Sequence, residues 1–326
     1  MTASATTASA PTMTEDVMTD GAAPRVILCV PTYRRPDGLR KLLSRVARLD
    51  YAGEIEVIVV DNDPVAREGA AVVSEMRKTF RFPLHCAVEA RRGHTYAYNL
   101  AFGLACRATP RPDYVAVLDD DEYPSPQWLR EMIRVALDYD VDIVGGPVWP
   151  VFDQPDHWLA ASGLFEPVRF GTGRVPMIYG AGNMLIRRAV LEHYLDEPFL
   201  HDFAFTGGSD YDFFWRCRID GRSFAWANTA EVFETTPPAR TTVGYLLRRK
   251  FRNGTEATRL ERKFVNGATG MARRWYTGLG LLGIGILSLP VAALRGRRAV
   301  MDSLIHAARG AGRIAAEFDF HYEQYR

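Results

Sequence analysis

The sequence contains few cysteines, and they are not arranged for cross-linking or for structural zinc. Its 326 residues include four, Cys29, Cys86, Cys106 and Cys217, with no CxxC pair and no regular spacing. This pattern argues against a disulfide framework and against a zinc ribbon. A reducing compartment is therefore the better expectation.

Net charge is nearly absent as well, since 40 Lys and Arg residues stand against 39 Asp and Glu, a formal charge of +1. This balance excludes a generally basic nucleic-acid binder, and we expect no nucleic-acid partner. Hydrophobic residues at 47% and charged residues at 24% exclude global disorder, collagen and coiled coil. The charge is unevenly placed, because residues 248–326 carry +9 and residues 1–247 carry −8. Such a tail either meets phosphates or an anionic membrane, or forms a solvated basic surface.

The first 24 residues lack the parts of a secretory signal, with no basic region followed by an apolar one. They are rich in Ala, Thr and Ser. We therefore predict a disordered leader over residues 1–24.

Buried strands alternate with helical patterns from residue 26 onward. A continuous apolar run typical of a strand buried on both faces occupies residues 26–30, and further strands are expected over residues 55–60, 84–88, 114–118 and 141–144. The alternation predicts an α/β fold with a mostly parallel sheet between helices. Residues 148–205 are irregular, apart from a helical pattern over 187–194, and another helix is expected over 210–220.

Acidic residues follow two of these strands, at the edge where open α/β sheets bind ligands. Asp61 and Asp63 end the second strand, and the fourth strand is followed by Asp119, Asp120, Asp121 and Glu122. Four adjacent carboxylates repel one another, and a hard cation such as Mg²⁺ or Mn²⁺ that bridges to substrate phosphates would neutralise them. A capped helix start or a solvated acidic turn is the alternative.

A third acidic segment, Gly207 to Arg216, reads GGSDYDFFWR. Asp210 would lie at a helix N-terminus, where a carboxylate is favoured. It is therefore either a helix cap or a functional carboxylate.

Four segments together resemble the family 2 glycosyltransferases, which are inverting enzymes with the GT-A fold. They are VPTYRR from Val30, VVDND from Val59, LDDDEYP from Leu118 and the Gly207 segment, and the resemblance covers about residues 25–260. ETTPP from Glu234 and RRKFRNG from Arg248 look like the non-processive bacterial branch, closest to exopolysaccharide glucosyltransferases of the succinoglycan type. No QxxRW motif follows, so processive synthesis is not expected.

The resemblance implies roles on the donor side. Pro31, Thr32 and Tyr33 would frame the nucleobase, and Asp61 would accept a hydrogen bond from its imide, which favours uracil. Asp119 would lie near the ribose and Asp121 would hold the metal, with Asp120 able to replace either. The nucleotide-sugar segment would contribute Arg92, Gly93 and Asn99.

On the acceptor side, Gly182 and Asn183 lie in a segment that resembles the loop approaching donor sugar and acceptor. Asp210 would be the general base. Ser209 stands where the family usually has Glu, so Asp212 could share the work.

Other positions depart from the family pattern. Tyr98 replaces the Arg of the family's Ala-Arg-Asn, which leaves Arg91 or Arg92 to face the phosphates. No late histidine ligand is evident, and Glu234 near that point could be structural.

The C-terminal tail contains an uncharged stretch of spanning length, Trp275 to Leu294. Arginines flank it on both sides, and it includes Pro290 and several glycines. A membrane span, an interfacial segment and a soluble helix pair all remain open. We assign residues 261–326 to a basic, apolar, membrane-associating tail and residues 25–260 to the GT-A domain. The expected location is the cytoplasmic face of the inner membrane.

The expected function is transfer of a hexose from a UDP-sugar, with UDP-glucose the first candidate, to a glycan or polyprenyl-diphosphate-linked acceptor, assisted by Mn²⁺ or Mg²⁺. A nucleotidyltransferase that makes nucleotide sugars is one alternative. It would usually need a Gly-rich phosphate loop after the first strand, where this chain has no glycine before Gly38. A non-catalytic nucleotide-sugar-binding module is the other, and it would not need the Asp210 segment.

Overall fold

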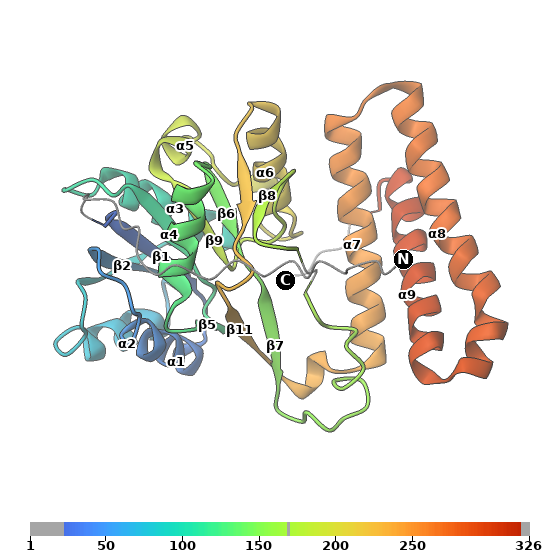
Figure 1. The fold of residues 1–326 in the computed structure, drawn as a ribbon, viewed down its shortest axis with the longest axis horizontal. Helices are drawn as coiled ribbons and strands as arrows, with labels where there is room; N and C mark the ends of the chain where they lie inside the picture. The colour runs from blue at the N-terminus through green and yellow to red at the C-terminus, as the bar shows by residue number, and fades with distance from the viewer. Residues whose placement is uncertain (1–22, 168–169, 321–326) are drawn as a thin grey trace, which may run out of the picture.

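The computed structural model describes residues 23–167 and 170–320, and its larger part is a sheet with helices on both faces (Figure 1). The main sheet has the strand order β3-β2-β1-β4-β9-β6-β10-β8. Its strands are β1 (Val26–Thr32), β2 (Ile55–Asp61), β3 (Leu84–Val88), β4 (Tyr114–Val117), β6 (Ile143–Gly145), β8 (Gly173–Val175), β9 (Met184–Arg187) and β10 (Phe224–Trp226). Of the predicted leader, residues 1–22 lie outside the described residues.

The half of the sheet that begins at β3 is parallel, because β1 pairs in parallel with both β2 and β4, and β2 with β3. The carboxyl ends of these strands therefore meet at one edge. Beyond β4 the sheet is mixed, since β9 runs antiparallel between β4 and β6. The predicted α/β fold is confirmed, whereas the short strands β8, β9 and β10 were not predicted.

The pleat of β1 divides the core into two layers. Val26, Leu28 and Val30 pack with α1, α2 and α4, while Ile27 and Cys29 face α3, α5 and α6. Burial of each large apolar side chain contributes about 1.5–3 kcal/mol. The helices are α1 (Pro36–Val46), α2 (Glu68–Met76), α3 (His94–Arg107), α4 (Trp128–Asp138), α5 (Arg188–His193) and α6 (Ser209–Ile219).

A second, three-stranded sheet joins distant parts of the chain. Its order is β5 (Glu122–Pro124), β11 (Val232–Thr236) and β7 (Val148–Phe152), with β11 antiparallel to β5. The register pairs Glu234 with Glu122. This sheet therefore brings Glu234 beside the acidic run that follows β4.

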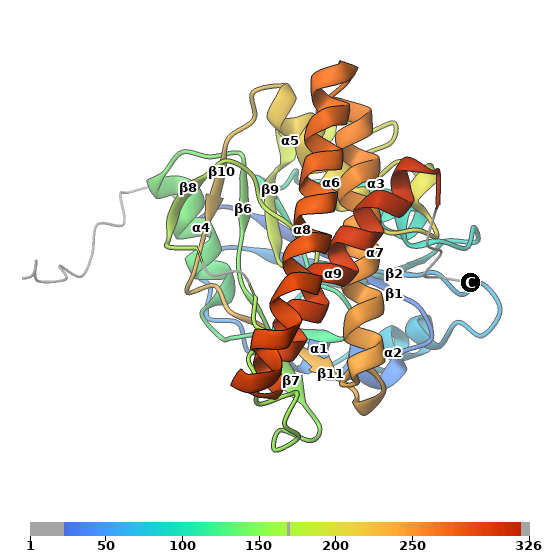
Figure 2. The same cartoon turned by 90° about the vertical axis from the view of Figure 1, so that its right-hand side faces the viewer.

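The C-terminal residues form three long helices, α7 (Val243–Phe264), α8 (Gly267–Arg295) and α9 (Arg297–Glu317). Figures 1 and 2 show α7 against the α/β part, with α9 and α8 beyond it. The predicted apolar helical tail is confirmed. The predicted domain boundary between residues 260 and 261, however, falls inside α7, which is one continuous helix.

Glycines allow α8 and α9 to approach closely. A Cβ on Gly285 of α8 would lie 2.4 Å from the backbone nitrogen of Ala307, and one on Gly310 of α9 would lie 2.4 Å from that of Leu282. Gly280 and Gly283, on other faces of α8, have nothing within 4 Å of such a Cβ. Only some of the glycines in this helix are thus required by packing.

The outward face of α8 is exposed and apolar, with Tyr276, Leu287 and Leu294 being 82%, 80% and 90% exposed. Among the described residues, one helix is long and apolar enough to cross a membrane, and it is α8.

Substitution of these glycines tests the packing of α8 on α9. We expect Gly285→Ala to lower the free energy of unfolding by ~1–3 kcal/mol, because the added methyl group meets backbone. The matched change Gly283→Ala should raise it by up to ~1 kcal/mol through helix propensity. Thermal unfolding followed by circular dichroism measures both, and equal shifts for the two variants would contradict the packing.

Candidate active site

A cleft of about 850 Å³ lies at the carboxyl ends of the parallel strands and is closed on its far side by α7. It gathers most of the predicted site residues, which come from separate segments of the chain. Those that line it are Pro31, Thr32, Tyr33, Arg92, Gly93, Asp119, Asp120, Asp121, Gly182, Asn183 and Asp210.

Asp61 does not line this cleft, contrary to its predicted role beside the nucleobase. Its side chain is fully buried, and its two oxygens accept hydrogen bonds from the backbone nitrogens of Asp63 and Ala70, each at 3.0 Å. Ala70 lies in the first turn of α2, where free amides attract a carboxylate. The neighbouring Asn62 lines the cleft instead.

Asn99 and Asp212 are also placed elsewhere. The amide of Asn99 bonds both backbone groups of Phe199, donating to its oxygen at 2.8 Å and accepting from its nitrogen at 2.9 Å. Asp212 is fully buried and pairs with Arg216 at 2.9 Å and with Lys263 at 2.5 Å. The prediction that Asp212 shares the base role is therefore wrong, because both of its oxygens are held by cations away from the cleft.

Asp120 fixes the loop after β1. It accepts hydrogen bonds from the Thr32 hydroxyl at 2.9 Å, the Tyr33 backbone nitrogen at 3.2 Å and Arg35 at 2.8 Å. Asp121 accepts from the same Arg35 nitrogen at 2.8 Å, and its side chain is 20% exposed against 8% for Asp120. Of the two, Asp121 is the carboxylate more open to the cleft.

Asp119 and Glu122 form the buried floor of the acidic cluster. The Tyr98 hydroxyl donates to Asp119, and the Asp119 backbone nitrogen donates to Glu122 at 2.9 Å. Burial, reinforced by the charge of Asp121, raises the pKa of Asp119 to about 7. Burial and the nearby Asp119 likewise raise the pKa of Glu122 well above its ordinary range. Tyr98, which replaces the Arg of the family pattern, thus holds Asp119 in place.

The predicted acceptor loop contacts this floor. A Cβ on Gly182 would lie 2.2 Å from Glu122 Oε1, so a larger residue there would displace the Glu122 carboxylate. The Asn183 amide donates to the oxygens of Pro147 and Ala230 at 3.0 and 2.9 Å and accepts from Trp128 at 2.8 Å. Asn183 therefore shapes the wall of the cleft through its own hydrogen bonds.

The acidic cluster offers oxygen ligands of the kind that Mg²⁺ and Mn²⁺ prefer. Glu234 joins it from β11, and Arg240 bridges Glu234 and Asp121 at 3.1 and 3.4 Å. Across residues 23–167 and 170–320, no group of three or more Asp, Glu, His or Cys side chains has the geometry of a metal site. The donors fit an ion that takes one or two carboxylates and completes its shell with phosphate oxygens and water.

Asp210 lies in the first turn of α6, after the N-cap Gly208. Burial raises its pKa, whereas hydrogen bonds from the backbone of Tyr211 and of Asp210 itself, and then the charge of Arg252, lower it. The preceding Ser209 contacts His94 Nε2 at 3.0 Å, and His94 Nδ1 contacts the oxygen of Ala204 at 3.1 Å. Because that carbonyl can only accept, Nδ1 carries the proton and Nε2 accepts from the serine. Burial lowers the pKa of His94 to about 4, so the ring is neutral at pH 7.

The far wall of the cleft comes from α7, for which the sequence predicted no role in the cleft. One face of this helix lines the cleft with Tyr245, Leu246, Arg249, Lys250, Arg252, Asn253 and Glu256. Their spacing follows the helical repeat. This repeat was the feature of the sequence that could have predicted a shared face of α7. The three cations among them suit anionic groups such as phosphates.

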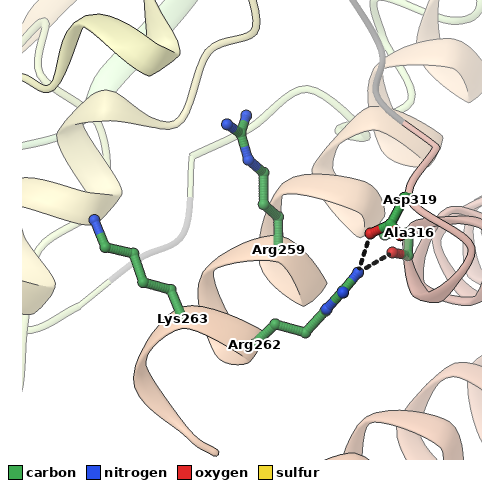
Figure 3. A pocket seen from close by; sticks show the side chains of 5 residues that line it. All are labelled: Arg259, Arg262, Lys263, Ala316 and Asp319. Carbon is green, nitrogen blue, oxygen red and sulfur yellow. Dashed lines mark hydrogen bonds and ion pairs between the residues drawn. The ribbon is translucent and has the colours of Figure 1, made fainter.

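A smaller cavity of about 350 Å³ lies near the C-terminal end of α7 (Figure 3). Arg262 points across it and bonds the Ala316 oxygen at 3.0 Å and Asp319 at 2.7 Å. Lys263 pairs with Asp212 of α6, and Arg259 donates to Thr206 at 3.0 Å. These contacts join α7 to its neighbours, so we interpret this cavity as structural.

Comparison with known proteins identifies the family. The family model described as glycosyl transferase family 2 matches residues 27–195. The chain is 30% identical over 311 residues to the succinoglycan biosynthesis protein ExoM of Rhizobium meliloti (strain 1021), covering 91% of this chain and 94% of that protein. The chain therefore belongs to glycosyltransferase family 2, and its predicted resemblance to succinoglycan-type enzymes is confirmed.

Solved structures confirm the GT-A fold. The mannosyltransferase PcManGT from Pyrobaculum calidifontis, solved with GDP-Man and Mn²⁺, matches with a TM-score of 0.61 at 20% identity, covering 91% of this chain and 88% of that one. Residues 1–349 of TarS from S. aureus, solved with UDP, match with a TM-score of 0.51 at 16% identity, covering 92% and 93%. The family and fold together support a glycosyltransferase role over a nucleotidyltransferase or a binding module.

The position of Asp61 is testable. We expect Asp61→Asn to lower the free energy of unfolding by ~1–3 kcal/mol, because an amide cannot accept both backbone hydrogen bonds. UDP affinity of the folded protein, measured by calorimetry, should change less than about twofold. An equally stable variant with strongly weakened UDP binding would instead favour the nucleobase contact.

Proposed function

We propose that this protein is an inverting, metal-dependent glycosyltransferase that moves a hexose from a UDP-sugar, UDP-glucose being the first candidate, to a hydroxyl of a glycan or polyprenyl-diphosphate-linked acceptor. One observation carries the proposal: a single cleft holds Asp210 on one wall, the Asp119–Glu122 carboxylates on another and the cations of α7 on a third. The named role of the Rhizobium meliloti relative in succinoglycan biosynthesis supports a polysaccharide product.

The donor would enter along the loops after β1 and β3. Arg92 and Arg34 lie over the ring of Tyr33, at 6.0 and 5.0 Å from its centroid, which leaves a cationic, aromatic platform for a nucleotide. Asn62 accepts from the Gly93 nitrogen at 3.0 Å and donates to the Arg91 oxygen at 2.7 Å, so it shapes this wall. TarS was solved with UDP and PcManGT with GDP-Man, which is consistent with a nucleoside diphosphate here.

Asp121, with Asp119 and Glu234 beside it, would hold Mn²⁺ or Mg²⁺. The bound ion would stabilise the negative charge of the leaving diphosphate. Arg35 and Arg240 already contact Asp121, and Arg249 lines the same cleft, so the protein itself supplies further positive charge for phosphate oxygens.

Asp210 would act as the general base. Its carboxylate would take the proton of the acceptor hydroxyl while that oxygen attacks the anomeric carbon opposite the departing UDP, which inverts the configuration. A base of this kind contributes ~10²–10⁴-fold. The raised pKa of Asp210 makes it a stronger base, and the neutral His94–Ser209 pair beside it adds no charge that would weaken it.

The function is tested with purified protein, UDP-glucose, UDP-galactose and GDP-mannose, Mn²⁺, and membrane extract as the source of acceptor. We expect release of UDP, its loss with EDTA, and a drop in kcat of ~10² or more for Asp210→Asn. Calorimetry should find UDP binding by Asp210→Asn nearly intact. Transfer that persists in Asp210→Asn, or that ignores EDTA, would overturn the assignment of the base or of the metal.

The tail would hold the enzyme at the cytoplasmic face of the membrane, where a lipid-linked acceptor lies. Two arginines of the bundle are paired internally, Arg274 with Glu317 at 2.7 Å and Arg313 with Glu261 at 2.6 Å. Arg273, Arg295 and Arg297 are instead exposed at the two ends of the apolar face of α8. Each cation near an anionic leaflet is worth about 1 kcal/mol, in addition to the burial of apolar side chains.

Membrane binding is tested by sedimentation with vesicles of neutral or partly anionic lipid. We expect the full chain to sediment with anionic vesicles, and Leu287→Glu with Leu294→Glu to bind at least about tenfold more weakly. Leu137→Glu, at an exposed leucine of α4, is the matched control and should bind like wild type. A full chain that stays in the supernatant with every vesicle would show that α8 does not bind membrane.

A further inference from the structure

Glu256 of α7 lies at the start of α6, close to the proposed base. A Cβ on Gly208, the N-cap of α6, would lie 3.8 Å from Glu256 Cγ. Asp210 follows two residues later, and both carboxylates line the same cleft. One turn before Glu256 on its own helix, Arg252 pairs with it at 3.1 Å between Nε and Oε1.

The α6 segment itself supplies no second acidic group to the cleft near Asp210. Ser209 occupies the preceding position and bonds His94. Asp212 is buried between Arg216 and Lys263. Within the part of the chain that the structure describes, the neighbouring carboxylate at the N-terminus of α6 comes from α7.

We propose that Glu256 is a positioning residue for the proposed base: it holds Arg252 in an ion pair and compensates the cation that would otherwise act on Asp210. The inference rests on the proposed function, because it assigns Asp210 the base role. Glu256 acts through Arg252 and does not itself accept a proton from the substrate.

The charges around the pair give the arrangement a pH dependence. Burial raises the pKa of Glu256 to about 7, and the charge of Asp210 adds to this rise. The charges of Arg252, Arg249 and Arg259 oppose it. From α3, Tyr98 and His94 line the same cleft and are neutral at pH 7, because burial raises the pKa of Tyr98 and lowers that of His94.

The sign follows from the charge of Glu256, whose pKa is raised to about 7 mainly by burial. The base role requires an ionised Asp210, whose charge also adds to the raised pKa of Glu256. Below pH 7, protonated Glu256 no longer offsets the charge of Arg252, and the stronger positive charge near Asp210 weakens the base. Above pH 7, ionised Glu256 neutralises Arg252, so Asp210 becomes a stronger base and transfer speeds up.

The test is the pH dependence of kcat between pH 5 and 9 for wild type, Glu256→Gln and Glu261→Gln. Glu261 is the matched control, since it also lies on α7 and pairs with an arginine, Arg313 at 2.6 Å, but does not line the cleft. We expect wild type and Glu261→Gln to gain rate through pH 7. Glu256→Gln should lack this rise, being within about twofold of wild type at pH 5.5 and about tenfold slower at pH 8.5. The KM for the donor should change little.

A second variant separates this role from a loss of folding. Adding Arg252→Gln to Glu256→Gln removes the cation whose charge Glu256 offset and should restore part of the rate at pH 8.5. A wild-type pH profile for Glu256→Gln, an equal loss at every pH, or no recovery in the double variant would overturn the proposal. If Asp210→Asn stays active, the proposed function has failed; if it is inactive while Glu256→Gln keeps the wild-type profile, only the role of Glu256 has failed.

Discussion

The concentration of negative charge at one edge of the sheet is the constraint on which the cleft depends. Asp119, Asp120, Asp121 and Glu122 follow β4 without a break. Each must be compensated, because buried like charges repel strongly. Asp120 is satisfied by the loop after β1, and Asp121 by two arginines from distant segments, Arg35 and Arg240. The same compensation that stabilises the fold therefore draws cations to the edge where a nucleoside diphosphate would lie.

The sequence predicts the strands that are buried on both faces, because such strands appear as continuous apolar runs. The runs at residues 26, 55 and 114 became β1, β2 and β4, and the shorter, less buried strand expected near residues 84–88 is β3. The residues just beyond β1 and β4 line the cleft, because the carboxyl ends of these parallel strands meet at one edge of the sheet. In contrast, β8 and β10 have three residues each, and the second sheet pairs β5 with β11, more than 100 residues away. No local pattern in the sequence predicts pairings between strands so far apart.

Side-chain direction at the end of a strand was the part that could not be predicted. Asp61 and Asn62 are adjacent, and successive side chains of a strand point to opposite faces. The free amides at the start of α2 hold the Asp61 carboxylate, so Asn62 takes the cleft position. Asp210 and Asp212 differ in the same way, because Lys263 of α7 pairs with only one of them. In each pair, a tertiary contact selects the residue that reaches the cleft.

The two faces of α7 connect the cleft to the tail. One face carries Arg252 and Glu256 into the cleft, while Gly254 between them packs against α9, where a Cβ would lie 2.3 Å from the oxygen of Arg309. Gly312 of α9 approaches Phe251 equally closely. Contacts between backbones leave no side chain that could adjust, so a shift of α9 must move α7 with it. The position of the α8–α9 pair therefore helps to set the far wall of the cleft.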